Sequence, residues 1–126
     1  MALGKIKADT LEHSTVGSLD TKFVVKGSAK AICNMTPSGG SNAASSLNIS
    51  SVTDGGVGVN TAALSNAFSA AKAAVPTGIC HDESNNRIVS YDDTSASSLA
   101  SRTTKCSDGS TSDSFDYTLV AHGDLA

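Results

Sequence analysis

In residues 114–125, SFDYTLVAHGDL, apolar and polar side chains alternate more clearly than in any other stretch of the chain. Between positions 115 and 122, one face would carry Phe115, Tyr117, Leu119 and Ala121, and the other Asp116, Thr118, Val120 and His122. Because successive side chains of a strand point to opposite sides, this period of two predicts a β-strand with one face in a core. The rest of the fold is inferred outward from this strand.

Similar short segments precede it, and Gly, Ser, Asn and Asp residues that favour turns separate them. They occupy residues 24–35 (VVKGSAKAICNM), 46–54 (SLNISSVTD), 57–64 (VGVNTAAL), 75–80 (VPTGIC), 87–91 (RIVSY) and 97–105 (SSLASRTTK). The sequence DGG at 54–56 is a strong hairpin-turn signal. About seven short strands at near-regular spacing predict an all-β domain, either an antiparallel β-sandwich or a small, knob-like barrel.

Residues 61–75, TAALSNAFSAAKAAV, fit two local structures. Leu64, Phe68, Ala71 and Val75 lie at helical spacing, and the alanines also favour a helix. Alternatively, Leu64, Asn66 and Phe68 end a strand, and SAAKAA forms a short loop before the next one. Tertiary context overrides the propensity of short segments, so both alternatives stay open at this point.

The composition favours a β-rich chain that relies on neighbours. About a quarter of the 126 residues are Ser or Thr, only 4% are aromatic and Trp is absent. Small hydroxylated residues suit sheets and tight turns. Few aromatic side chains provide little large apolar surface, so we expect identical subunits to supply the missing burial.

The distribution of charged and apolar residues argues against nucleic acid and membrane as partners. The formal net charge is -3, and the 9 Lys and Arg residues are scattered. Nucleic-acid binding requires a positive stripe that neutralises phosphates, and a membrane-spanning helix requires roughly 18 consecutive apolar residues. Neither pattern occurs, and the first residues lack the apolar segment of a secretory leader. We therefore expect no nucleic acid, no membrane insertion, and folding in a cytoplasm.

Residues 1–23 differ from the rest because their apolar side chains are too sparse for a core of their own. We expect them to form an extended N-terminal arm that lies against another surface or becomes ordered in an oligomer. Residues 24–126 are then the β-rich knob domain. The side chains expected to anchor the arm are Leu3, Ile6, Leu11, Leu19 and Phe23.

No pattern in the sequence predicts catalysis, a metal site or a cofactor. His81 lies in the sequence CHDE, but neighbouring residues of a strand point to opposite faces and cannot converge on one ion. A glycosidase needs two carboxylates that face each other across a cleft. The acidic pairs Asp82–Glu83 and Asp92–Asp93 do not meet this requirement, because neighbouring residues of a strand point to opposite faces. The sequence contains neither a Gly-x-Ser-x-Gly elbow nor a phosphate-binding loop. The chain is therefore expected not to be an enzyme.

The cysteines and tyrosines are few. Cys33, Cys80 and Cys106 have spacings unlike those of zinc sites, and an odd number does not close a disulfide framework. Reduced, partly buried thiols are the simplest interpretation, with a Cys80–Cys106 bridge as the alternative. Tyr117 is expected in the core, whereas Tyr91 is either packed or exposed and facing a ligand.

Three blocks of sequence resemble a family of viral proteins. Residues 6–35, with KADT followed by a Ser- and Gly-containing arm and the strand VKGSAKA, resemble the start of short virion proteins and tail-fibre segments of aquatic tailed bacteriophages. Residues 47–68, LNISSVTDGGVGVNTAALSNAF, and the ending HGDLA at 122–126 are similar to later blocks in the same order. The resemblance covers most of the chain and is weakest from 77 to 114.

The resemblance implies a non-enzymatic protein of the virion surface. It would be a homotrimeric short fibre or a capsid decoration (cement) protein, with the arm docked on capsid or tail proteins. The alternative is a tail-fibre tip module that binds a receptor or a host surface glycan through Tyr91 and the polar loops at 38–46 and 108–113. Sugar sites usually use exposed aromatic rings, and Tyr91 is the candidate for one.

Overall fold

The chain folds into strands over nearly all of its regular structure. The computed structural model describes residues 8–15, 17–36, 46–71, 73, 75–80, 87–91, 95–113 and 116–126, without the side chains of His13, Val75, Ile79 and Cys80. The strands described are β1 (Thr10–His13), β2 (Gly17–Asp20), β3 (Ala31–Met35), β4 (Ile49–Asp54), β5 (Val59–Leu64), β6 (Val75–Cys80), β7 (Arg87–Tyr91), β8 (Ser98–Lys105) and β9 (Tyr117–His122). One short helix, α1 (Thr21–Gly27), lies between β2 and β3.

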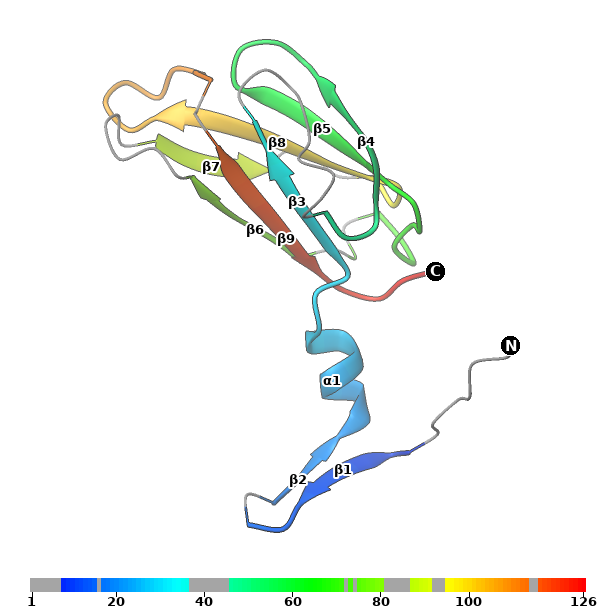
Figure 1. Ribbon diagram of the computed structural model, residues 1–126. Coiled ribbons are helices and arrows are strands. Elements are labelled where there is room, and N and C mark those ends of the chain that lie inside the picture. Colours follow the sequence, from blue (N-terminus) through cyan, green and yellow to red (C-terminus); the bar gives the residue numbers. More distant parts are fainter. Residues whose placement is uncertain are drawn as a thin grey trace.

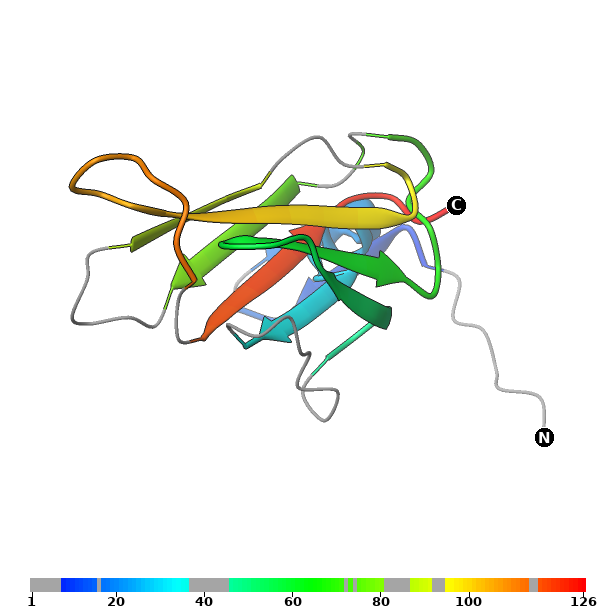
Figure 2. The same cartoon turned by 90° about the horizontal axis from the view of Figure 1, so that it is seen from above.

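Strands β3–β9 form two facing antiparallel sheets, which we call the head. One sheet has the order β3-β9-β6 and the other β4-β5-β8-β7. The two layers are visible in Figures 1 and 2. The predicted C-terminal strand is β9, and it lies in the middle of its sheet, paired with β3 and β6. The all-β, sandwich-like prediction is therefore confirmed.

The two sheets also approach each other at both lateral edges. Ile32 and Leu47 form an antiparallel bridge just before β4, with N–H···O distances of 3.0 and 2.8 Å. At the other edge, β6 and β7 come so close that a Cβ atom on Gly78 would lie 2.7 Å from Cγ1 of Val89. The head is thus a two-layer sandwich whose sheets nearly meet at both edges, as in an incompletely closed barrel.

The core lies between the sheets, and four of its ten buried apolar residues are Ala or Cys. It contains Ala31, Cys33, Met35, Ala62, Leu64, Phe68, Leu99, Tyr117, Leu119 and Ala121. The apolar face predicted for the C-terminal strand is confirmed from Tyr117 on, because Tyr117, Leu119 and Ala121 are all buried while Thr118 and Val120 are only partly so. Phe115, which was predicted on the same face, lies outside the described residues. Alternation along β3 and β5 follows the same rule.

The described residues between 61 and 75, which are 61–71, 73 and 75, do not form the helix that their spacing allows. Strand β5 ends at Leu64, and the backbone that follows donates hydrogen bonds to distant segments. The N–H of Phe68 donates to the Ala96 carbonyl at 2.8 Å, and the N–H of Ser69 donates to Asp124 at 2.8 Å. Phe68 is 2% exposed and bridges to Leu125. The strand-ending alternative is correct up to Leu64, where β5 ends, whereas Phe68 takes part only in an isolated bridge. Burying Phe68 between the sheets outweighs the helical propensity of the alanines.

The N-terminal segment is folded, which corrects two predictions. Residues 10–20 form the hairpin β1–β2 instead of an extended arm, with Thr10 opposite Asp20 and His13 opposite Gly17. Val24–Gly27, predicted to begin a strand, belong to α1. Asp20 caps that helix by accepting a 2.9 Å hydrogen bond from the Lys22 N–H, which is a local start signal that outweighs the β-branched valines. The predicted boundary between residues 23 and 24 therefore falls inside α1.

Candidate functional site

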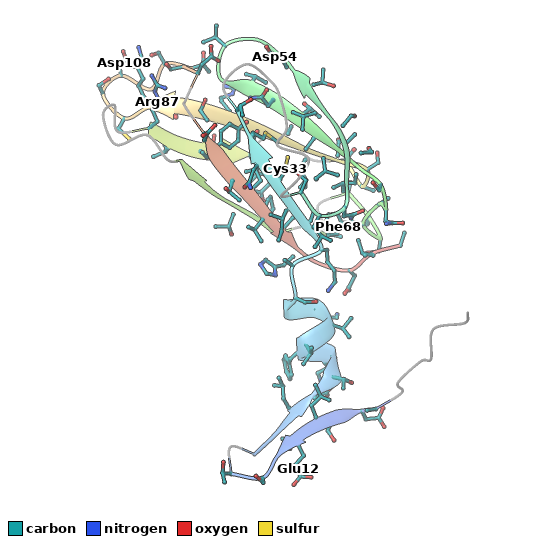
Figure 3. The ribbon with its side chains drawn as sticks, viewed as in Figure 1. Glu12, Cys33, Asp54, Phe68, Arg87 and Asp108 are labelled. Atoms are coloured by element: carbon teal, nitrogen blue, oxygen red, sulfur yellow. The ribbon has the colours of Figure 1, made fainter. Side chains whose placement is uncertain are left out.

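The hairpin β1–β2 and helix α1 project from one end of the head, and we call residues 10–27 the stalk (Figures 1 and 3). No residue of α1 is buried, and the described side chains of β2 are exposed or only partly covered. Glu12 lies on the hairpin, far from the sandwich, whereas Cys33 and Phe68 point into the interior of the head in Figure 3. The stalk thus presents its side chains to solvent on all sides.

Several of these exposed stalk side chains are apolar. They are Leu11, Leu19, Phe23, Val24 and Val25, with exposures between 40% and 58%. Leu11 and Leu19 are direct cross-strand partners, so their side chains lie on the same face of the hairpin. Three of the predicted anchoring residues, Leu11, Leu19 and Phe23, are in this set. The other two, Leu3 and Ile6, lie outside the described residues.

The beginning of the helix is stabilised by local charge. Besides capping the helix, Asp20 forms a 2.9 Å ion pair with the ammonium group of Lys22. The Lys22 backbone N–H, and then its side chain, hold the pKa of the Asp20 carboxyl below its ordinary value. The Lys22 Nζ also lies 5.2 Å from the centre of the Phe23 ring. These contacts define the orientation of Phe23 at the hairpin–helix junction.

A short neck fixes the stalk to the head. Lys26 forms a 3.4 Å ion pair with Asp124, and Nδ1 of His122 donates a 2.9 Å hydrogen bond to the Gly27 carbonyl at the end of α1. The Lys30 N–H donates to the Ala121 carbonyl at 2.8 Å, and its ammonium donates to the Val25 carbonyl. His122, predicted on the polar face of its strand, is therefore a neck residue. Sequence spacing gave no indication of this contact, because the partners are 95 positions apart.

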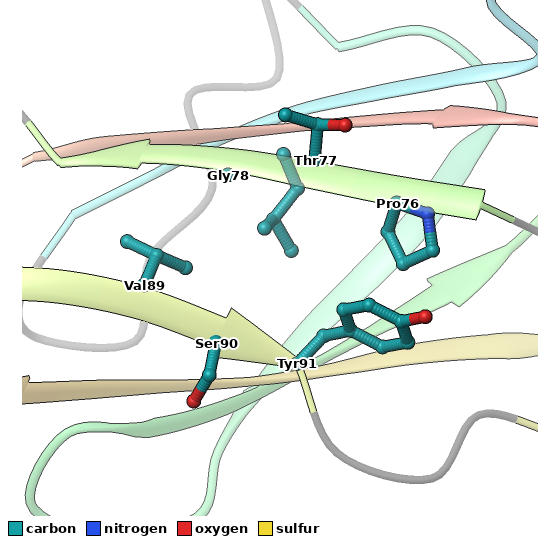
Figure 4. A pocket seen from close by; sticks show the side chains of 7 residues that line it. Pro76, Thr77, Gly78, Val89, Ser90 and Tyr91 are labelled. Atoms are coloured by element: carbon teal, nitrogen blue, oxygen red, sulfur yellow. The ribbon is translucent and has the colours of Figure 1, made fainter.

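A pocket of about 410 Å³ opens where β6 and β7 face each other, and we call it the seam pocket (Figure 4). Its lining consists of Pro76, Thr77, Gly78, Val89, Ser90, Tyr91 and Leu119. Among the described strands, β6 pairs only with β9 and β7 only with β8, so the two facing edges carry backbone groups without a ladder between them. The pocket thus lies at the edge where the two sheets face each other without strand pairing.

Tyr91 lies at the mouth of the seam pocket, with its ring directed toward Pro76 (Figure 4). Its register partner is Ser101, whose side chain is fully buried, so Tyr91 belongs to the inward face of its sheet. It is nevertheless 47% exposed at the end of β7. Of the two alternatives for Tyr91, packed or exposed, the structure therefore agrees with the exposed one. Pro76 and Gly78, which line the pocket from β6, were not identified as site residues from the sequence.

The described residues provide little for acid–base or metal chemistry. Within them, no group of three or more His, Cys, Asp or Glu side chains lies close enough to hold a metal ion. His81, the pair Asp82–Glu83 and the pair Asp92–Asp93 lie outside the described residues. No helix in the described part of the chain is long and apolar enough to cross a membrane.

The cysteines differ in environment. Cys33 is 1% exposed, and burial raises the pKa of its thiol to about 11, against a smaller opposing effect of a hydrogen bond with Ser46. Cys106 is an exposed, free thiol just after β8. The side chain of Cys80 lies outside the described residues, and the free thiol of Cys106 does not form the Cys80–Cys106 bridge in this structure.

The two polar loops named from the sequence have different outcomes. Residues 38–45 of the first lie outside the described residues. In the second, the Asp108 carboxylate accepts hydrogen bonds from the backbone and hydroxyl of Ser110, and these bonds lower the pKa of Asp108. Asp113 accepts from the Gly58 N–H at 2.7 Å. Both acids thus serve to hold the loop in place.

Comparison of the chain with protein-family models, with curated proteins and with solved structures finds no match. The functional argument therefore rests on the stalk, the neck, the seam pocket and the sequence.

Proposed function

We propose that this chain is a non-enzymatic structural protein of a bacteriophage virion surface, in which the stalk attaches the head to the particle. The observation that carries the proposal is the set of five exposed apolar side chains on a stalk whose helix buries none of its residues. The viral setting comes from the resemblance of residues 6–35, 47–68 and 122–126 to short virion proteins. Capsid or tail proteins are the proposed attachment partners.

The physical argument concerns the stability of the stalk. A two-stranded hairpin is marginally stable on its own in water, and a helix of seven residues is far below the length at which isolated helices persist. Covering an apolar side chain of this size contributes about 1.5–3 kcal/mol when burial is complete. Leu11, Leu19 and Phe23 are about half exposed, so a partner surface that covers them would add part of this stabilisation for each side chain.

Self-association is part of the same proposal. The buried core of the head has ten apolar residues, of which three are alanines and two are aromatic, so its own apolar burial is modest. Identical subunits that pack their stalks together would cover apolar surface on each other. A homotrimer is the form that the resemblance implies, either as a short fibre or as a capsid decoration. Particle copy number separates the two, because decoration follows the capsid lattice and a fibre follows the symmetry of the tail.

A second candidate function is recognition of a receptor or glycan by the head. The specific observation that favours it is the seam pocket, where the half-exposed Tyr91 ring lies at the mouth. Aromatic side chains are enriched in binding sites, and this chain has few of them. The two functions are compatible, since attachment by the stalk leaves the head free.

Particle incorporation tests the attachment role. The double variant Leu11→Ser, Leu19→Ser should fold its head normally but be depleted from purified virions of the encoding phage, measured by quantitative mass spectrometry. The matched control is Ile88→Ser, which replaces an equally exposed apolar side chain on the head. Normal incorporation of the stalk variant would refute attachment through this hairpin.

A further inference from the structure

The seam pocket combines one aromatic face with polar groups. Tyr91 is the exposed ring, and Val89 and Leu119 provide apolar surface within the pocket. Thr77 and Ser90 also line the pocket, but their register partners, Val120 and Arg102, place both hydroxyls on the outer face of the head. Polar groups for a ligand beside Tyr91 therefore come from the backbone donors and acceptors on the facing edges of β6 and β7. A ligand that fits must therefore have an apolar face for the ring and several hydroxyl groups for the strand edges.

The described lining residues of this pocket carry no charged side chain. A phosphate or carboxylate ligand would find no charged partner among these described residues, and an unpaired charge is costly to move out of water. A volume of about 410 Å³ is at the small end of the range for small-molecule sites. It suits one or two sugar rings and excludes a folded partner.

We propose that the seam pocket binds a neutral pyranose, with the C–H face of the sugar ring stacked on Tyr91. Sugar hydroxyls then exchange hydrogen bonds with backbone groups on the facing edges of β6 and β7. Pro76 faces the Tyr91 ring and limits how far the sugar slides out along the seam (Figure 4). This inference rests on the second candidate function and names its ligand class; it does not depend on attachment by the stalk.

The test is a titration of the ¹⁵N-labelled full chain with neutral methyl glycosides of glucose, galactose, mannose and N-acetylglucosamine, followed by amide chemical shifts. At least one glycoside should shift the amides of residues 77–78 and 89–91 in a saturable manner. Sorbitol, which has the hydroxyl groups but no ring to stack, should leave them unchanged, and methyl glucuronide should bind more weakly than methyl glucoside. Absence of shifts at these residues with all four glycosides would overturn the proposal.

Variants of the ring give the sharper comparison. Tyr91→Ala should weaken binding of the best glycoside by about tenfold or more, whereas Tyr91→Phe, which keeps the aromatic face, should stay within a few-fold of the original chain. Tyr91→Leu keeps an apolar side chain without an aromatic face, so its affinity for the glycoside should be as weak as that of Tyr91→Ala. It replaces the alanine variant in the comparison if the alanine variant does not fold. Ile88→Ala lies on the outer face of the same strand and should bind normally. Equal affinity for Tyr91→Leu and the original chain would refute stacking.

Cell binding separates this inference from the function on which it rests. If the fluorescently labelled original chain and its Tyr91→Ala variant bind host cells equally well, recognition uses another surface, and the pocket assignment fails alone. Saturable glycoside binding without cell binding would leave the pocket assignment standing and remove the recognition role.

Discussion

Leu11 and Leu19 lie directly opposite each other in the hairpin β1–β2, and they are 49% and 48% exposed. In a folded hairpin of a larger sheet, such a pair would be covered by a neighbouring layer. Here the hairpin stands apart from the head, and the next element, α1, also leaves Phe23 and Val25 open to solvent. This cross-strand pair therefore marks the centre of the surface that we assign to attachment and self-association.

Replacing this pair should change the oligomeric state of the protein. The variant Leu11→Ser, Leu19→Ser removes the apolar contact while keeping side chains that strands tolerate, so we expect sedimentation velocity to shift from trimer toward monomer. The circular dichroism of the head should be unchanged. A trimer of undiminished stability in this variant would place the subunit interface elsewhere.

Removing the Tyr117 hydroxyl should destabilise the head through its polar partners. That hydroxyl accepts a 2.9 Å hydrogen bond from Nδ2 of Asn60 and lies 2.9 Å from Oγ of Ser101, and all three side chains are buried. Tyr117→Phe removes the acceptor of the buried Asn60 amide, whereas Ser101 keeps its 3.2 Å hydrogen bond to the Asn60 carbonyl, so the free energy of unfolding should fall by about 1–3 kcal/mol. Tyr91→Phe, at the exposed tyrosine, should change it by less than about 0.5 kcal/mol. Urea denaturation of both variants checks the difference, and equal losses would contradict the buried cluster.

The buried thiol of Cys33 should make stability depend on alkaline pH. Its pKa is about 11 in the folded chain against an ordinary value of 9.0. Below pH 9.0 both states keep the proton; above it the unfolded state loses the proton first, so the free energy of unfolding falls as pH rises toward 11. A tenfold change in an ionisation constant corresponds to about 1.4 kcal/mol, so the loss should be on the order of 2 kcal/mol.

The control for this prediction is Cys33→Ala, which lacks the titrating group. Denaturant unfolding of both proteins at several pH values between 8 and 11 separates the contribution of Cys33 from that of other groups. The original chain should lose more stability than the variant across this interval. Parallel curves would mean that the Cys33 thiol ionises as easily in the folded chain as in the unfolded one.

Two glycines with nearly the same backbone conformation should differ in their tolerance of a side chain. Gly58 and Gly109 have φ values of +69° and +71°, but a Cβ on Gly58 would lie 2.7 Å from the Thr103 carbonyl oxygen and 2.8 Å from the Ser112 nitrogen. Nothing lies within 4 Å of a Cβ on Gly109. Gly109→Ala should cost about 1 kcal/mol from the left-handed conformation alone, and Gly58→Ala a few kcal/mol more from the clash. Thermal denaturation measures both, and similar losses would rule out the close approach at Gly58.

The local period of two was sufficient to identify most of the head. The alternation around Tyr117, Leu119 and Ala121 predicted β9 and its buried face, and the DGG turn correctly placed the hairpin between β4 and β5. The same reasoning failed at Val24 and Val25, where the Asp20 cap and its contact with Lys22 start a helix. Near 61–75 the sequence left two structures open because the decisive contacts of Phe68, to Ala96 and Leu125, come from far along the chain.

The sequence alone determined the class of the fold, the buried face of the last strand and the scarcity of apolar surface, since these depend on side-chain period and composition. Only the tertiary structure decided that β6 and β7 meet without pairing, that Tyr91 stays open beside Pro76, and that His122 holds the end of α1. The physical reason is that a strand's own pattern defines which face is apolar, whereas the position of its edges depends on contacts between residues distant in sequence.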